Sequence, residues 1–412
     1  MPAEQLVADY LKLGLRFGRL ADGFVDCWFG DPSLAHQVVD EPRPHPADLA
    51  GQARLLNERL ADTELEEPRR RFLTAQLTAL ECVADRLAGR PISFRAEVEA
   101  YFQVHIEPGD TDRYAEIHRA ISDLLPGNES LHDRLTNFYA RNHIPPERLQ
   151  GSVQAVSDEF RTIVRPLFGL PDTENVTYEV VRDKPWNAFN RYHGEHRSTV
   201  QLNATAGSNI AALPIIVTHE SYPGHHTHHC LKQTDLVEAR GWREHTIMLV
   251  NTPQCLVSEG MGEAALSVVM GEGWGEWTAA ILNGQGVHID GPLVERMLGL
   301  VVQLLPVRQD AAILLHDNGA DPDEVIEYLQ RWLLLPEERA KHLVSFLTDP
   351  LWRAYTTTYI EGARLVGEWL AAGPVAQSIT DRYRTLLHEP LLPADLVKDL
   401  GARAPGVGND ER

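Results

Sequence analysis

The segment Leu213-Pro-Ile-Ile-Val-Thr-His-Glu-Ser-Tyr-Pro-Gly-His-His226 joins an apolar run to a histidine-rich end. The apolar residues 215–217 predict a helix that continues into His219, with Ser208 or Asn209 as its N-cap. In the common zinc-site motif H-E-x-x-H, the two histidines share one face of a helix because they are one turn apart. Both imidazoles then reach one zinc ion, and the glutamate lies beside the position that carries water. The segment therefore predicts a metal-dependent hydrolase built on helices.

The spacing of the histidines departs from that motif, because Pro223 stands four residues after His219. In a straight helix His226 would face the same way as His219 but lie about 10 Å further along the axis, and His225 would point away. Pro223 lacks the N–H that would bond the His219 carbonyl, and Gly224 tolerates unusual torsions. We therefore expect a bend that lets His225 act as the second ligand, with His226 as the alternative.

The run H-E-S-Y-P-G-H-H (219–226) resembles the motif of a large bacterial family of gluzincin-like metallopeptidases of unknown function. The resemblance covers roughly residues 185–370 and also includes Arg191-Tyr192, Ser258–Gly262, Arg308 with His316, and Tyr359–Gly362. It implies a mainly α-helical, gluzincin-like architecture with a small β-sheet beside a central cleft. One position departs from the family pattern: Ala312 stands where the family usually has aspartate.

The same resemblance implies a set of zinc ligands and a catalytic base. His219 and His225 would be joined by a glutamate from a following helix. Glu259 lies in an apolar helical stretch, where a carboxylate is costly to bury unless it is paired or bound to a metal. Glu272 is the alternative third ligand, although it lies among helix-breaking glycines. Glu220 is the expected general base, which takes a proton from the attacking water.

Three further residues receive roles from the resemblance. Tyr359 is expected to hydrogen-bond the oxyanion, with His316 as the alternative, and Arg308 to anchor a substrate carboxylate. Glu263, one helical turn after Glu259, is expected to hydrogen-bond a ligand histidine. From spacing alone, Tyr359 would be a core residue and Arg308 a partner in a structural ion pair.

Two segments in the middle of the chain read as strands. Residues 176–181 and 198–203 carry alternating β-branched side chains. The second is a candidate edge strand on which an extended peptide could pair; a plain sheet edge is the alternative. Elsewhere helical periodicity dominates, and the apolar stripe from Leu6 to Phe24 predicts one long helix, followed by a loop at 31–48. We expect an N-terminal helical region at 1–170, a metal-binding catalytic region at 171–400 and a flexible tail at 401–412.

Charge and composition limit the classes of partner. The 412 residues carry a formal net charge of −21, and no Lys/Arg block interrupts the acidic balance. We therefore expect neither nucleic acid nor an anionic membrane surface as a partner. The absence of a leader-like N-terminus and of a clean apolar stretch of about 18 residues predicts no signal peptide and no membrane span. Four scattered cysteines without a CxxC pair suggest reduced thiols in a cytoplasm.

The function predicted from these residues is zinc-dependent cleavage of peptide bonds in short peptides. Two alternatives stay open: a zinc hydrolase acting on a non-peptide amide or a biosynthetic intermediate, and a helical scaffold whose metal site has decayed. Substrate identity, direction of cleavage and oligomeric state are not specified by the sequence.

Overall fold

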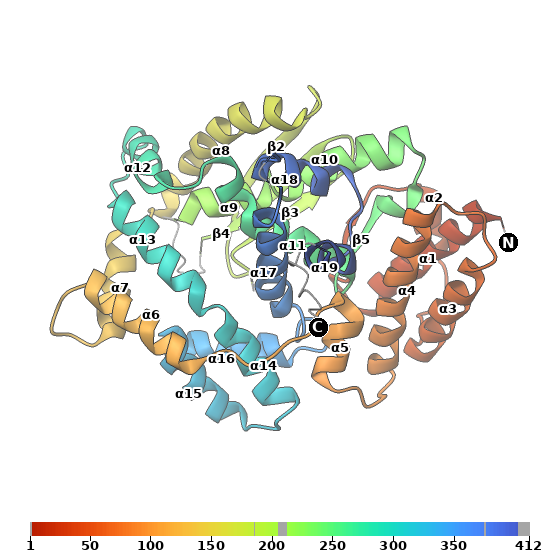
Figure 1. Cartoon of the computed structure of the whole chain (residues 1–412), viewed down its shortest axis with the longest axis horizontal. Coiled ribbons are helices and arrows are strands. Elements are labelled where there is room, and N and C mark those ends of the chain that lie inside the picture. Colours follow the sequence, from red (N-terminus) through yellow and green to blue (C-terminus); the bar gives the residue numbers. More distant parts are fainter. Residues whose placement is uncertain (1, 185, 205–211, 375, 403–412) are drawn as a thin grey trace, which may run out of the picture.

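The computed structural model describes residues 2–184, 186–204, 212–374 and 376–402. Within these ranges helices predominate and the strands are few and short, which confirms the mainly α-helical class with small sheets (Figure 1). The expected N-cap at Ser208 or Asn209 and most of the expected tail lie outside the described residues.

Helices account for most of the first 170 residues, as predicted. They are α1 (Ala3–Leu20), α2 (Pro32–Val39), α3 (Pro46–Leu60), α4 (Glu67–Leu87), α5 (Phe94–Phe102), α6 (Thr111–Leu124), α7 (Leu131–Arg141) and α8 (Pro146–Phe168). Two predictions were wrong here. The first helix ends at Leu20, and Phe24 lies beyond it, where its ring stacks on Phe17 at 4.9 Å. The expected loop contains α2, because Asp31 accepts the Ser33 N–H as an N-cap and a proline follows it.

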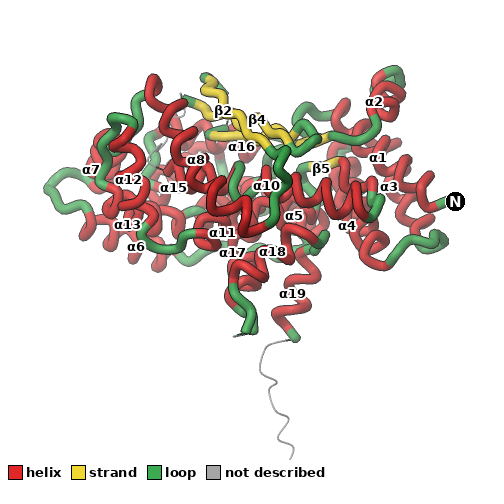
Figure 2. The backbone as a smooth tube through the Cα atoms, turned by 90° about the horizontal axis from the view of Figure 1, so that it is seen from above, coloured by secondary structure: helices red, strands yellow, loops and turns green. Residues whose placement is uncertain are grey.

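Five short strands in the described part of the chain form two small sheets. Strand β1 (Val25–Trp28) pairs antiparallel with β5 (Ile247–Leu249), and β2 (Asn175–Val181), β4 (Arg197–Asn203) and β3 (Ala188–Tyr192) form the other sheet in that order. The two predicted strands are confirmed to within one residue. The predicted edge is not, because β4 lies in the centre and is paired with β2 on one side and β3 on the other. It has no free edge for a peptide. Figure 2 shows β2 and β4 along one border of the helical body.

The β1–β5 pair contains an irregularity in its register. Val25 pairs with Leu249 and Cys27 pairs with Met248. An advance of two residues along β1 therefore corresponds to one residue along β5. Asp26 is the extra residue of this β-bulge. Bulges bend a strand and re-aim the side chain of the extra residue.

Helices return after the three-stranded sheet. They are α9 (Leu213–Glu220), α10 (His225–Lys232), α11 (Pro253–Val269), α12 (Trp274–Gly284), α13 (Gly291–Val301), α14 (Pro306–His316), α15 (Pro322–Leu333), α16 (Glu337–Thr348), α17 (Thr356–Ala371), α18 (Ile379–His388) and α19 (Pro393–Gly401). Helices α11 and α17 lie against each other at the centre of the molecule (Figure 1). A Cβ on Gly260 would lie 2.3 Å from the carbonyl oxygen of Gly362, so small residues allow the two backbones to touch.

One hydrophobic core joins the two expected regions, since its buried residues run from Leu6 to Leu396. Among the described helices one stretch, Gly291–His316, is long and apolar enough to cross a membrane, with a mean hydropathy of 1.5. It comprises α13, a short 3-10 turn and α14, which pack against α6, α12 and α15. Helices in the core of a protein can be equally long and apolar, so length and composition alone are weak evidence for a membrane span.

Candidate metal centre

The histidine motif lies on two separate helices. Helix α9 ends at Glu220 and α10 begins at His225, so the expected bend is a complete break. The φ of Gly224 is −71°, outside the left-handed region, and the reason for glycine is close approach. A Cβ on Gly224 would lie 1.9 Å from the carbonyl oxygen of His219. The break therefore folds the start of α10 back against the end of α9.

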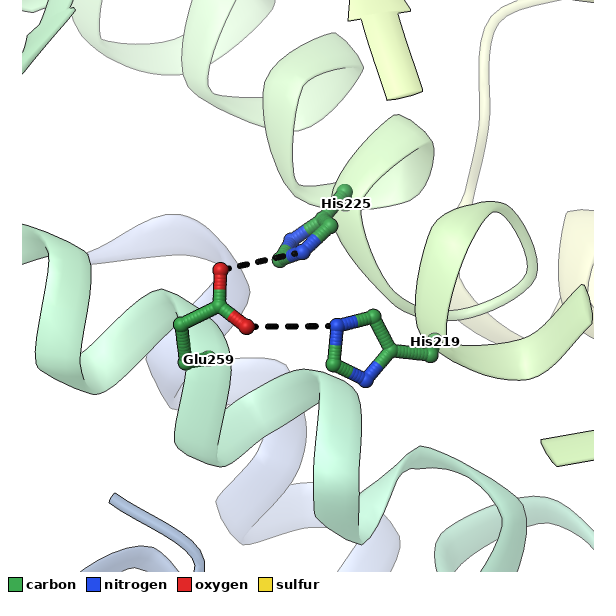
Figure 3. A group of neighbouring side chains, drawn as sticks. All are labelled: His219, His225 and Glu259. Atoms are coloured by element: carbon green, nitrogen blue, oxygen red, sulfur yellow. Dashed lines mark ion pairs between the residues drawn. The ribbon is translucent and has the colours of Figure 1, made fainter. Parts of the chain in front are cut away.

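This folding brings His219, His225 and Glu259 together (Figure 3). One candidate ligand atom from each residue lies within 4.8 Å of the others. The Nε2 of His219 is 3.3 Å from Oε2 of Glu259, and the Nε2 of His225 is 3.5 Å from Oε1. The three side chains come from α9, α10 and α11 and point toward one another. These are the residues that the sequence analysis proposed as ligands.

The three residues fit a divalent metal ion. Oε2 of Glu259 is buried and has no hydrogen-bond partner, although it faces the imidazole of His219. A buried acceptor without a donor is costly unless a proton or a metal ion satisfies it. Two imidazole nitrogens and one carboxylate oxygen are also the protein ligands of many catalytic zinc sites, which keep a fourth position open. We call His219, His225 and Glu259 the ligand triad.

The charges within the ligand triad depend on one another. Burial alone would lower the pKa of His219, but the carboxylate of Glu259 and the charges of Glu220 and Glu263 outweigh it and raise this pKa to about 10. Burial raises the pKa of Glu259, but His225 and His219 bring it well below its usual range. Without a metal ion, protons on the imidazoles supply the positive charge that the carboxylates require. A bound cation would replace them.

Glu220 lies beside the ligand triad without belonging to it. It is the last residue of α9, and its side chain is buried. Its backbone carbonyl accepts a hydrogen bond of 2.6 Å from the side-chain amide of Asn190 on β3, which fixes the end of the helix. Burial raises the pKa of Glu220, while His219 and His225 oppose that rise. A carboxylate with a raised pKa next to a metal site can both accept and return a proton.

His226 faces away from the ligand triad. Its Nδ1 is 2.8 Å from Oγ of Ser198 on β4, and its Nε2 is 3.1 Å from Oε2 of Glu174. The same carboxylate accepts hydrogen bonds from Arg161 at 2.6 Å and from Tyr222 at 2.7 Å. Burial raises the pKa of Glu174, but its three donors lower it to about 2. His226 thus ties the start of α10 to a buried carboxylate.

Each ligand histidine has a polar partner at its other ring nitrogen. Oε1 of Glu263 is 3.5 Å from Nδ1 of His219, as the sequence analysis expected of this glutamate. Oγ of Ser258 is 3.3 Å from Nδ1 of His225. Such contacts fix the orientation of an imidazole and select the nitrogen that faces a metal ion.

Two tyrosines, Tyr359 on α17 and Tyr355 at its N-cap, border the ligand triad. The ring of Tyr359 lies 6.3 Å from that of His219. The hydroxyl of Tyr355, which the sequence analysis did not single out, donates a hydrogen bond of 2.9 Å to Oε1 of Glu259. Since Tyr355 precedes Tyr359 by one turn, helical spacing alone could have identified it.

Arg308 and His316 both lie on α14, but their side chains have different surroundings. Arg308 is half-buried, its buried Nε has no hydrogen-bond partner, and Tyr359 and Glu263 are the groups that favour its charge. The Nε2 of His316 is 2.7 Å from the carbonyl oxygen of Leu347, and its charged neighbours do not include any member of the ligand triad. The two residues are two helical turns, or about 12 Å, apart on α14. Only Arg308 therefore faces the site, and the expectation for His316 is corrected.

Two other residues with metal-binding side chains do not belong to the ligand triad. Glu272 is exposed in the turn between α11 and α12, beyond the end of the helix that carries Glu259. His229 stacks on Tyr192, with the ring centroids 5.0 Å apart. Among the described residues, only the ligand triad forms a group of three or more histidine, cysteine or acidic side chains with metal-binding spacing.

Asp26 is a further acidic residue near the site. Burial raises its pKa to about 7; Glu259 and Glu220 add to that rise, while His225 and Lys232 oppose it. These neighbours belong to α9, α10 and α11, so the charge of Asp26 is coupled to the charges of those helices. No local sequence signal marked this residue, because the bulge exists only through pairing with a strand more than 200 residues away.

We expect Gly262→Ala to weaken metal binding without touching a ligand. A Cβ at this position would lie 2.7 Å from both Cε1 and Nδ1 of His219, so the imidazole must move. The loss of affinity should be at least about tenfold, as for other changes that misorient a ligand. The control is Gly367→Ala on α17, where a Cβ meets nothing within 4 Å and the helix should gain roughly 1 kcal/mol. Chelator competition measures both; equal affinities would contradict the assigned contact.

Comparisons with known proteins give a fold and no family. No protein-family model matches the chain, and no curated protein matches it. A solved structure from Colwellia psychrerythraea, described as a candidate lipoprotein, aligns with a TM-score of 0.54 and 13% identity. The alignment covers 86% of this chain and 66% of that protein, so the chain spans slightly less than two thirds of its length. At this identity the likeness concerns the fold alone.

Two further solved structures are more distant. A candidate lipoprotein of unknown function from Shewanella oneidensis aligns with a TM-score of 0.48 and 12% identity, over 87% of this chain and 73% of that one. The metallocarboxypeptidase 1 of Trypanosoma cruzi aligns with a TM-score of 0.41 and 14% identity, over 97% and 90% respectively.

Proposed function

We propose that the chain is a zinc-dependent hydrolase that cleaves peptide bonds in short peptides. The observation that carries the proposal is the ligand triad with Glu220 beside it: two histidines and a glutamate from three helices, and a buried carboxylate next to the first histidine. This combination supplies three ligands, an open position and a base. The resemblance of the motif to gluzincin-like metallopeptidases points to the same activity.

Zinc bound by the ligand triad would polarise the substrate carbonyl and make a water molecule more acidic. Glu220 is the base in the proposed reaction. It accepts a proton from the attacking water and then gives that proton to the leaving nitrogen, so that the amide bond breaks and an amine departs. The raised pKa of Glu220 suits both steps, because such a carboxylate holds a proton more readily than an exposed one.

Tyr355 and Tyr359 have two different roles in this proposal. Tyr355 donates to Glu259 and so holds the third ligand in place. Tyr359 has its ring next to that of His219, and its hydroxyl donates to the oxyanion that develops on the substrate carbonyl. Burial raises the pKa of Tyr359 well above its usual value, and the nearby Glu259 and Glu220 add to that rise. The phenol therefore stays protonated and remains a donor.

Arg308 is the proposed partner of a substrate carboxylate. The residue is half-buried, and its buried Nε lacks a hydrogen-bond partner. An arginine fork matches a carboxylate with two parallel hydrogen bonds, so a peptide with a free C-terminus suits it. This is the part of the proposal that favours short peptides over long chains.

Metal analysis together with a peptide-library screen tests the proposed function. We expect one equivalent of zinc per chain, and cleavage of short peptides with the product masses of amide hydrolysis. Zinc binding with cleavage only of non-peptide amides would replace the peptide substrate by the first alternative. A protein that binds no added zinc would be the helical scaffold instead.

A further inference from the structure

We propose that Asn190 and Tyr178, on the two outer strands of the three-stranded sheet, are positioning residues for Glu220. The inference rests on the proposed function, in which Glu220 is the base, and adds the contacts that keep this base in place. A metal ion would hold the members of the ligand triad by coordination, whereas Glu220 is not one of them. Its orientation therefore depends on the surrounding protein, and a base acts only within hydrogen-bond reach of the proton that it takes.

The register of the sheet places the two residues in one row. Tyr178 on β2 and Asn190 on β3 both pair with Val200 of the central strand β4. Side chains of residues that pair in this way share one face of a sheet. All three are buried, so the row faces the interior of the molecule. Its two polar members contact the residues at which α9 ends and the chain turns toward α10.

The side chain of Asn190 holds the main chain of Glu220. Its Nδ2 donates a hydrogen bond of 2.6 Å to the carbonyl oxygen of Glu220, where α9 ends. The last carbonyls of a helix have no partner within the helix, so an external donor fixes their direction. Asn190 is 5% exposed and its Oδ1 has no hydrogen-bond partner, so in the described part of the chain its side chain serves this carbonyl alone.

The main chain of Asn190 also faces the base. His193 donates its N–H to the carbonyl of Arg197, so alternate residues of β3 direct their N–H groups toward β4 and the N–H of Asn190 points to the opposite edge. Burial raises the pKa of the Glu220 carboxyl, and a hydrogen bond from this N–H opposes that rise together with the two ligand histidines. One residue of β3 thus contacts both the carbonyl and the carboxyl of Glu220.

Tyr178 holds the residue that follows the base. Its hydroxyl lies 2.7 Å from Oγ of Ser221 and donates a hydrogen bond of 2.9 Å to Oγ of Ser157 on α8. Because the single phenolic proton is given to Ser157, the hydroxyl of Ser221 is the donor in the first bond. All three side chains are buried. The peptide bond after Glu220 is therefore held on both sides, by β3 and by β2.

A double-mutant cycle tests the inference on zinc-loaded protein, with the peptide from the library screen that the parent cleaves fastest. Asn190→Ala should keep its zinc and lose about 10–100-fold in kcat, because a displacement of about 1 Å has an effect of that order. In the Glu220→Gln background the same change should have no further effect on the residual rate, since the base is already absent. Tyr178→Phe removes one hydroxyl and should lower kcat in the same way, by up to about tenfold.

The matched control is Asn142→Ala. Asn142 is also 5% exposed, and its Nδ2 donates a hydrogen bond of 3.0 Å to a carbonyl near a helix end, that of Phe138 on α7. This variant should lose stability but keep the kcat of the parent. Crystal structures give a readout independent of turnover: in zinc-loaded Asn190→Ala the Glu220 carboxyl should be displaced while the ligand triad stays in place.

Three results would overturn the inference while the proposed function stands. They are a loss of zinc from Asn190→Ala, parental kcat in this variant and in Tyr178→Phe, and an equal fall in kcat with and without the Glu220 carboxyl. If Asn190→Ala does not fold, the same cycle with Tyr178→Phe decides. A zinc-loaded parent that cleaves no peptide would instead contradict the proposed function, and the crystal structures would still test the positioning of Glu220.

Discussion

The variant Glu220→Gln should keep its zinc and lose at least about three orders of magnitude in kcat, because the amide cannot accept the proton that the mechanism requires. Glu220 does not belong to the ligand triad, so removing its charge leaves all three ligands intact. Burial raises the pKa of this carboxyl and so disfavours its ionised form, and a neutral glutamine should fit the site without loss of stability. Single-turnover rates and zinc content measure the two effects separately.

The control for this variant is Glu272→Gln, because Glu272 is exposed in the turn after α11 and lies outside the ligand triad. Its zinc content and kcat should match those of the parent. A Glu220→Gln variant with parental turnover would remove Glu220 from the mechanism. A variant that instead loses zinc would make Glu220 a ligand, contrary to the geometry of the site.

The second large effect concerns the two adjacent histidines. His225→Ala should reduce zinc affinity by more than about 1,000-fold, because it removes one of three ligands, whereas His226→Ala should reduce it by no more than the 10–100-fold typical of residues that support ligands. The reason is orientation: Nε2 of His225 faces Glu259, while both nitrogens of His226 face Ser198 and Glu174. Competition with a chelator of known affinity gives both values.

His226→Ala should affect stability more than metal binding. It removes one donor from Glu174, a carboxylate that is 2% exposed, and leaves the others to satisfy it. Loss of one partner of a buried charge network destabilises a protein by up to about 3–5 kcal/mol, so the melting temperature of the metal-free protein should fall. If His226→Ala lost zinc as severely as His225→Ala, the break between α9 and α10 would not select the ligand as the structure indicates.

The sequence predicted the helical class and the members of the ligand triad, for reasons that the structure makes clear. His219 and Glu220 follow an apolar run, and that run is a buried helix. Glu259 was conspicuous as a carboxylate in an apolar helix, and it is 4% exposed. In both cases a polar residue stood out from a pattern that local spacing could reveal.

Other features could not be predicted because they depend on contacts between distant segments. The bulge at Asp26 arises from pairing between strands from opposite halves of the sequence. Strand β4 lies in the middle of its sheet because β3 pairs with one of its edges. The alternation of side chains within 198–203 predicts a strand but not its neighbours. His316 shares a helix with Arg308, but its surroundings are set by Leu347 on another helix.

The break between α9 and α10 has a consequence for how such sites are recognised. A sequence motif specifies the number of residues between ligands, whereas metal binding depends on the distances between the ligand atoms. Here the count from the first histidine to the second is six instead of four, and the two imidazoles still face one carboxylate at 3.3 and 3.5 Å. The extra residues are absorbed by a chain reversal that only glycine can make, since a Cβ at Gly224 would overlap the His219 carbonyl. A pattern written for an unbroken helix would pass over this site, so the turn belongs in the pattern along with the ligands.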